Sequence, residues 1–286
     1  MSQTFTVRTP DGIDLLVRDW PLPVGTPCRG SALVVHGVGE HSDRYNHVAL
    51  ALSGIGLAVR SYDQRGFGRS GGPKGVLPRE DTLIYDAKMI YDACATDAAS
   101  RGDHAPPFLI GHSMGGGVVA RAVTGKWITP RGLILSSPAI EPLLTPIERA
   151  LAHTANLIAP NLQRPQGIKP AVLTHDANVL AAIAQDPWMH DRVTPRLVVS
   201  MINNGARALA DAPMLRVPTL LLIAGDDKVV VANASRTFAE RTPPDTCVLH
   251  SYDGLFHEVF NEREPDRSRV LGDLHAWLVA QMAARR

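Results

Sequence analysis

The chain has few of the features that mark membrane, secreted or nucleic-acid-binding proteins. No apolar run in its 286 residues approaches the roughly 20 residues that a membrane-spanning helix needs. The opening segment MSQTFTVRTPDG lacks the basic and apolar stretches of a secretory signal. Lys and Arg number 29 against 28 Asp and Glu, so the net charge of +1 offers no basic surface for nucleic acid or anionic membrane. We therefore expect a cytoplasmic protein with no nucleic-acid partner and no stable membrane insertion.

Cysteine is also scarce. The three cysteines, Cys28, Cys94 and Cys247, are far apart and odd in number, so they form neither a disulfide framework nor a metal-binding C-x-x-C pair. We expect them to be buried or incidental thiols in a reducing compartment. The remaining composition, with 45% hydrophobic and 20% charged residues, is typical of a globular protein that buries a sizeable core.

Short apolar runs alternate with helical segments along most of the chain. The first twenty residues alternate apolar and polar side chains around Pro10-Asp11-Gly12, which predicts a hairpin. From residue 31 the runs SALVVH, GLAVRSYD, PFLIGH, RGLILSS, PTLLLIAG and TCVLHSY are continuously apolar, as in strands buried on both faces. Helices are expected at about residues 43–54, 79–101, 114–125, 231–241 and 266–283. The alternation predicts an α/β fold with a mostly parallel central sheet flanked by helices.

One region interrupts this alternation. Residues 139–205 contain no strand-like run, and prolines recur between segments of helical character. An unstructured loop of this length is uncommon in a compact domain, so we expect a helical cap inserted into the sheet. The expected organisation is a first core part at residues 1–138, a cap at 139–205 and a second core part at 206–286.

The stretch GHSMGGG, residues 111–117, raises three alternatives: a phosphate cradle, a tight turn without chemistry, or the seat of a nucleophile. Its spacing matches neither phosphate-binding pattern, G-x-x-x-x-G-K-[ST] or G-x-G-x-x-G. It does match G-x-S-x-G between an apolar strand and a helix, the context of a nucleophile elbow. There Ser113 would stand above the sheet at the positive end of a helix. The five-residue pattern alone does not exclude a tight turn without chemistry.

A nucleophilic serine needs a base and an acid, which follow it in chain order in α/β hydrolases. Asp226 and Asp227 come directly after one apolar strand, and His257 follows the last one. Only one of two adjacent aspartates can face the imidazole, and we favour Asp227. Of the eleven histidines the others have structural interpretations; His112 is expected to point away from Ser113, and Glu258 to be a bystander.

Several motifs together resemble the monoacylglycerol lipase and lysophospholipase group of serine α/β hydrolases. They are HGVGEHS with Arg44-Tyr45, DQRGFGRS, GHSMGG, GDDKVV and FHE, and the resemblance spans most of the chain. It implies that Ser113 is the nucleophile, that His257 is the general base and then acid, and that Asp227 orients the imidazole. It also implies an oxyanion hole formed by the backbone N–H groups of Val38 and Met114.

The expected substrate contacts are less specific. Glu40 and Arg44, four residues apart, form either a local ion pair or, by the resemblance only, a contact with the alcohol half of a substrate. Ile140 and Leu144 belong to an apolar cap segment that suits an acyl pocket. Trp188 lines an acyl channel or packs within the cap. No metal or organic cofactor is needed, because the protein supplies nucleophile, base and oxyanion donors.

The leading hypothesis is hydrolysis of a lipid-like carboxylic ester through an acyl-enzyme on Ser113, most specifically by a monoacylglycerol lipase. Alternatives in the same class are a lysophospholipase and a general short-chain carboxylesterase. The same triad also serves amidases and peptidases, and a non-catalytic receptor for a small hydrophobic ligand is a further alternative. The apolar cap leaves transient docking on membranes open.

Overall fold

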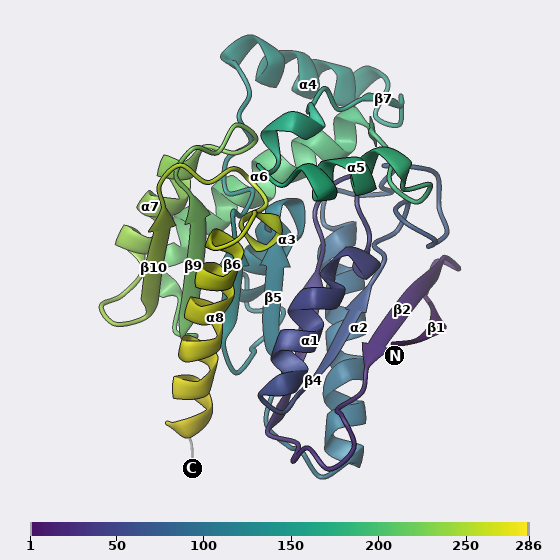
Figure 1. Ribbon diagram of the computed structural model, residues 1–286. Helices are drawn as coiled ribbons and strands as arrows, with labels where there is room; N and C mark the ends of the chain where they lie inside the picture. Colours follow the sequence, from purple (N-terminus) through teal and green to yellow (C-terminus); the bar gives the residue numbers. More distant parts are fainter. Residues whose placement is uncertain (1, 285–286) are drawn as a thin grey trace.

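The computed structural model describes residues 2–284 of the chain. Its central element is an eight-stranded sheet (Figure 1). The strand order is β1-β2-β4-β3-β5-β6-β9-β10. The strands β2 and β1 form the expected antiparallel hairpin, and β2 is also antiparallel to β4, whereas the six strands from β4 to β10 pair in parallel. Their bounds are β1 Gln3–Arg8, β2 Asp14–Trp20, β3 Gly30–Val35, β4 Leu57–Tyr62, β5 Phe108–His112, β6 Leu133–Ser136, β9 Thr219–Ala224 and β10 Cys247–Tyr252.

Helices cover both faces of this sheet. One face packs against α1 and α8, and the other against α2, α3 and α7 (Figure 1). The central strands are apolar throughout because alternate side chains enter the two cores: Leu33 and Val35 of β3 enter one, Ala32 and Val34 the other. The helices are α1 Asn46–Gly54, α2 Thr82–Ser100, α3 Ser113–Thr124, α7 Ala232–Arg241 and α8 Asp266–Ala283. These elements confirm the predicted α/β hydrolase fold.

The segment between β6 and β9 lies at one end of the sheet, at the top of Figure 1. It contains α4 Pro146–Ile158, α5 Ala177–Gln185 and α6 Pro195–Asp211. Two short strands that the sequence did not predict, β7 Arg164–Pro165 and β8 Arg192–Val193, pair antiparallel within it. Thr145 starts α4 with a capping box. Since α6 continues past residue 205 and packs against α3, the division into core and cap stays a proposal.

Short 3₁₀ turns complete the elements at Ser42–Tyr45, Pro170–Val172, Ala212–Met214 and Val259–Asn261. All three thiols are free. Cys28 is exposed, Cys94 is buried and Cys247 is partly buried. Between residues 2 and 284 we find no helix with both the length and the apolar character to cross a membrane.

Candidate active site

Ser113 lies at a sharp turn where β5 ends and α3 begins. Its φ angle of +53° is left-handed, a strained conformation for a residue with a side chain. Gly115 follows in the first turn of α3, where an added Cβ would overlap the carbonyl oxygens of Val35 and His36. The turn therefore depends on glycine at this position, and it presents Ser113 at the carboxyl edge of the sheet.

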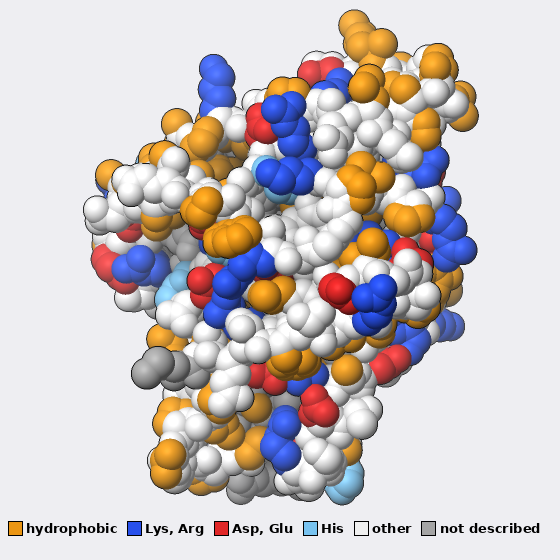
Figure 2. All heavy atoms as spheres, turned by 90° about the vertical axis from the view of Figure 1, so that its right-hand side faces the viewer, with side chains coloured by type: hydrophobic (Ala, Val, Ile, Leu, Met, Phe, Trp, Pro, Cys, Tyr) orange, Lys and Arg blue, Asp and Glu red, His pale blue; other side chains and the backbone are white. Residues whose placement is uncertain are grey.

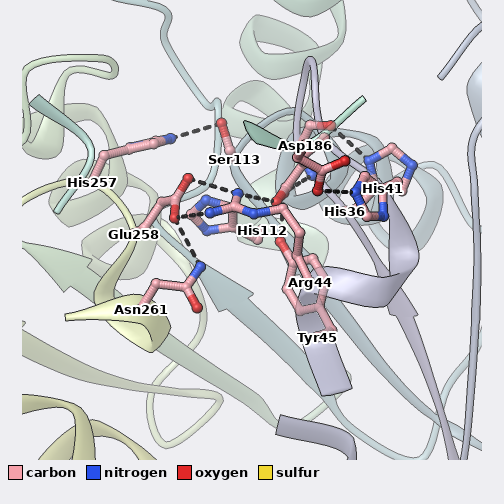
Figure 3. A network of polar contacts seen from close by, with 12 residues as sticks. His36, His41, Arg44, Tyr45, His112, Ser113, Asp186, His257, Glu258 and Asn261 are labelled. Carbon is pink, nitrogen blue, oxygen red and sulfur yellow. Dashed lines mark hydrogen bonds and ion pairs between the residues drawn. The ribbon is translucent and has the colours of Figure 1, made fainter. Parts of the chain in front are cut away.

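The structure brings Ser113 together with His257 and Asp227. The Oγ of Ser113 lies 2.8 Å from Nε2 of His257 (Figure 3), and Nδ1 of His257 lies 2.8 Å from Oδ2 of Asp227. Nδ1 donates a hydrogen bond to the carboxylate, so Nε2 is free to accept one from the serine hydroxyl. The side chains of His257 and Asp227 are only 3% and 1% exposed. The arrangement is that of an activated serine nucleophile.

Asp227 rather than its neighbour faces the imidazole. Its Oδ1 accepts the backbone N–H groups of Val229 and Val230 at 2.8 and 3.0 Å. Burial alone would raise the pKa of Asp227, but the His257 imidazole and these N–H groups lower it below the ordinary value. Asp226 is exposed, and its Oδ1 lies 3.7 Å from Nζ of Lys228. Asp227 is therefore held as an ionised carboxylate beside His257.

Two backbone amides are free to serve as oxyanion donors. The N–H groups of Val38, in the loop after β3, and of Met114, in the first turn of α3, have no acceptor among residues 2–284. Glu40 holds the loop after β3, because its Oε1 accepts the N–H of Gly37 at 2.5 Å and the hydroxyl of Tyr45 at 2.6 Å. Free, preorganised N–H groups beside a serine suit a developing oxyanion.

Arg44 connects this loop to the residue after His257. Its guanidinium lies 2.7 Å from Oε2 of Glu40 and makes contacts of 2.9 and 2.7 Å with the two oxygens of Glu258 (Figure 3). The predicted ion pair of Glu40 and Arg44 is thus present, but it is buried. Burial disfavours the charge of Glu40, yet Arg44 and nearby histidines lower its pKa to about 2. The expectation that Glu258 is a bystander is wrong.

We expected from the sequence that His112 would point away from Ser113, but it does not. Its ring lines the same cavity as Ser113, and its centroid lies 4.9 Å from that of His257. Its Nδ1 lies 3.1 Å from the carbonyl oxygen of Ser136. Burial, followed by the proximity of His257, lowers the pKa of His112 to about 4, so its imidazole is neutral near pH 7.

Two cavities meet at Ser113. The larger, of about 400 Å³, is mainly apolar and is lined largely by residues of the segment between β6 and β9, Leu144 among them. The smaller, of about 40 Å³, is lined by Glu40, Arg44, His112 and Glu258 together with apolar side chains. Both cavities are bordered by Val38, Ser113, Gln166, Ile168 and Val229. The other two expected contacts do not line them, since Ile140 is packed in the core and Trp188 is 47% exposed.

Residues of the segment between β6 and β9 contact the loop after β3 directly. Nε2 of His41 lies 2.7 Å from Oδ2 of Asp186, and the N–H of His190 donates to the carbonyl of Gly39 at 3.0 Å. Within the described residues, no group of three or more His, Cys, Asp or Glu side chains is arranged to hold a metal ion.

Comparison with known proteins shows which family and which solved structures this chain resembles. The profile of the family described as serine aminopeptidase, S33 matches residues 26–264. A monoacylglycerol lipase of Mycolicibacterium smegmatis is 30% identical over 90% of this chain and 90% of its own length. The crystal structure of the Paleococcus ferrophilus monoacylglycerol lipase, also 30% identical, superposes with a TM-score of 0.82 over 93% of this chain and 99% of that one. A soluble variant of the Saccharomyces cerevisiae monoglyceride lipase, 23% identical, shares the fold with a TM-score of 0.88 over 98% of this chain and 94% of that one.

Proposed function

This chain belongs to the serine aminopeptidase S33 family of α/β hydrolases, and we propose that it hydrolyses monoacylglycerols. Its similarity to monoacylglycerol lipases places it among the serine hydrolases of the lipase and esterase group. The observation that carries the proposal is the hydrogen-bonded chain from Ser113 through His257 to Asp227, at the junction of a large cavity and a small one that charged side chains help to line.

In the proposed mechanism the Ser113 hydroxyl attacks the ester carbonyl while Nε2 of His257 takes its proton. The tetrahedral oxyanion is stabilised by the N–H groups of Val38 and Met114, and Asp227 stabilises the imidazolium. His257 then protonates the leaving alcohol, which leaves an acyl-enzyme on Ser113. Water activated by His257 attacks that ester, and a free carboxylic acid and the free serine hydroxyl result.

The two cavities support an ester with unequal halves. The larger cavity borders Ser113 and is lined by cap side chains such as Leu143, Leu144 and Met201, which suit an acyl chain. The smaller cavity suits a short alcohol. Its charged side chains are two carboxylates and one guanidinium, Glu40, Glu258 and Arg44, so its charge is unfavourable to the phosphate of a lysophospholipid. These features favour a monoacylglycerol over a lysophospholipid.

The family description makes a peptidase the second candidate. An aminopeptidase needs a carboxylate that is free to bind the substrate ammonium. Both carboxylates of the smaller cavity, Glu40 and Glu258, are already paired with Arg44. This pairing favours an ester substrate with an uncharged alcohol.

The decisive experiment compares wild type with Ser113→Ala on monoacylglycerols, lysophospholipids, short-chain esters and aminoacyl amides. We expect the highest kcat/KM for monoacylglycerols, and covalent labelling by a fluorophosphonate that Ser113→Ala abolishes. Unchanged ester hydrolysis by Ser113→Ala would contradict the mechanism. Labelling without turnover of any substrate would instead favour a receptor for a hydrophobic ligand.

The cap surface supports transient contact with lipid, from which such a substrate comes. Hydrophobic side chains gather at the top of the molecule, over the cap (Figure 2). Those more than half exposed on or beside α4 are Leu143, Ile147, Leu151, Leu157, Ile158 and Leu162. An apolar helix surface of this kind can enter the headgroup region of a membrane without spanning it.

A further inference from the structure

Gln166 is a cap residue that reaches the junction of the two cavities. It follows β7 directly and borders both the larger cavity and the smaller one, as Ser113 does. Its Oε1 is buried, and no donor among residues 2–284 reaches it. Its Nε2 makes no hydrogen bond within the same residues. A buried amide oxygen without a donor is costly, so the position calls for a hydrogen-bonding group from outside the protein.

The position of this amide is held from two sides. The backbone N–H of Gln166 donates to the carbonyl of Asp191 at 2.7 Å. Its side chain packs on Gly39, where an added Cβ would lie 3.3 Å from Nε2 and 3.7 Å from Oε1. Gly39 has a φ of +79° and adjoins Val38. The amide is therefore placed against the loop that carries a proposed oxyanion donor.

The charged side chains of the smaller cavity are paired within the protein. Glu40 and Glu258 both pair with Arg44, and Nδ1 of His112 contacts Ser136. Gln166 is the side chain with an unused donor and an unused acceptor at the same place. A hydroxyl group, which both donates and accepts, is the complementary partner.

We propose that the side-chain amide of Gln166 determines specificity for the alcohol half of the substrate by binding a free hydroxyl of a glyceryl ester. This inference rests on the proposed ester hydrolysis and deepens it. Oε1 accepts a hydrogen bond from the hydroxyl, and Nε2 donates one to an oxygen of the same alcohol. Esters whose alcohol lacks a hydroxyl leave the amide without a partner and are selected against.

The test compares a 1-monoacylglycerol with the ethyl ester of the same fatty acid. In Gln166→Met, which keeps the length of the side chain, we expect kcat/KM for the monoacylglycerol to fall about tenfold or more. The ethyl ester should change less than about twofold. Gln163→Met is the matched control: Gln163 lies in the same cap segment, borders neither cavity and donates to the carbonyl of Lys74.

The outcomes separate this inference from the function on which it rests. Equal losses for both esters in Gln166→Met would overturn it, because the amide would then support the oxyanion loop. Wild-type enzyme that hydrolyses both esters without preference would overturn it and leave ester hydrolysis intact. Wild-type enzyme that hydrolyses neither would contradict the proposed function. Thermal unfolding of Gln166→Met establishes that the variant is folded.

Discussion

Arg44 and Glu258, 214 positions apart, form a two-pronged ion pair beside the candidate nucleophile. Glu258 directly follows His257, while Arg44 also holds Glu40, whose carboxylate fixes the loop of Val38. One guanidinium therefore joins the loop of the proposed base to the loop of a proposed oxyanion donor. The side chains of Arg44 and Glu258 are 10% and 5% exposed, so their charges are poorly screened by water.

Loss of one partner of this pair should be costly. We expect Glu258→Ala to lower the free energy of unfolding by about 3 kcal/mol, because Arg44 is left with one carboxylate for its buried charge. Urea unfolding measures this, and kcat on a p-nitrophenyl ester should fall as the His257 loop loses its anchor. The control is Asp92→Ala, which removes the exposed ion pair with Lys88 and should cost less than about 1 kcal/mol. Similar costs for the two variants would refute the prediction.

Substitution of the two adjacent aspartates, Asp226 and Asp227, should have very different effects on kcat. Asp227→Asn is expected to lower kcat by about 10⁴-fold with little change in KM, because the amide no longer selects the productive tautomer of His257. Asp226→Asn, which changes an exposed neighbour, should keep nearly full activity. Steady-state kinetics on one ester measure both variants. A large loss in Asp226→Asn, or a small loss in Asp227→Asn, would reverse the assignment.

The parts of the site that the sequence predicted are those with a local signal. Ser113 stands in a short motif between an apolar strand and a helix, and Asp227 and His257 each follow an apolar strand. Because parallel strands end at the same edge of a sheet, these positions converge without knowledge of side-chain contacts. The strands and core helices were predictable for the same reason: their apolar spacing is local.

The missed features all depend on long-range contacts. Glu258 forms its buried ion pair with Arg44, in a segment far away in the chain. Gln166 lies in a polar cap stretch without periodicity, and only the fold places it at Ser113. The backbone of His112 is ordinary extended strand, and only the fold places its ring beside His257 in the cavity. Met189 lines the smaller cavity, whereas its neighbour Trp188, an expected contact, is 47% exposed.

Replacement of Gly115 and of Gly272 by alanine should have opposite effects on the stability of the protein. Gly115→Ala would push a methyl group onto the backbone oxygens of β3 and its following loop, so we expect strong destabilisation and loss of activity. Gly272, within α8, has no atom within 4 Å of an added Cβ. Gly272→Ala should therefore stabilise the protein by roughly 0.5–1 kcal/mol. Thermal unfolding of both variants gives the answer, and tolerance of Gly115→Ala would refute the role of close backbone contact at the turn.

The proposed lipid contact of the cap predicts a difference between two apolar surfaces. Replacement of Leu157 and Ile158 by serine should weaken binding to phosphatidylcholine vesicles by about tenfold or more, because about 0.8 kcal/mol is lost per CH₂ group no longer buried in lipid. Leu50→Ser, on α1, removes an exposed leucine outside the cap and should leave binding unchanged. Vesicle co-sedimentation measures both. Equal binding by wild type and the double variant would exclude this surface as the contact.

Acid should destabilise the protein through its buried neutral histidines. The pKa of His112 is lowered to about 4, chiefly by burial, among the charged or titratable groups His257, Glu40, Glu258 and Arg44. In the unfolded chain a histidine titrates near pH ~6.5, so between these values the unfolded state binds a proton that the folded state does not. Stability from this group is complete above about pH 7 and declines towards pH 4, by up to about 1.4 kcal/mol per pH unit. Burial lowers the pKa of His36 as well, so its contribution has the same sign.

The variant His112→Asn isolates this contribution. Its amide can still donate to the carbonyl of Ser136, but it does not titrate, so the free energy of unfolding should depend less steeply on pH between about 6.5 and 4. The expected difference in the loss from pH 7 to pH 5 is about 2 kcal/mol. His104→Asn, at an exposed histidine, should follow the wild-type curve. If urea unfolding from pH 4.5 to 7.5 gave parallel curves for wild type and His112→Asn, the acid sensitivity would have to come from other groups, with His36 the first to be substituted because it too is wholly buried.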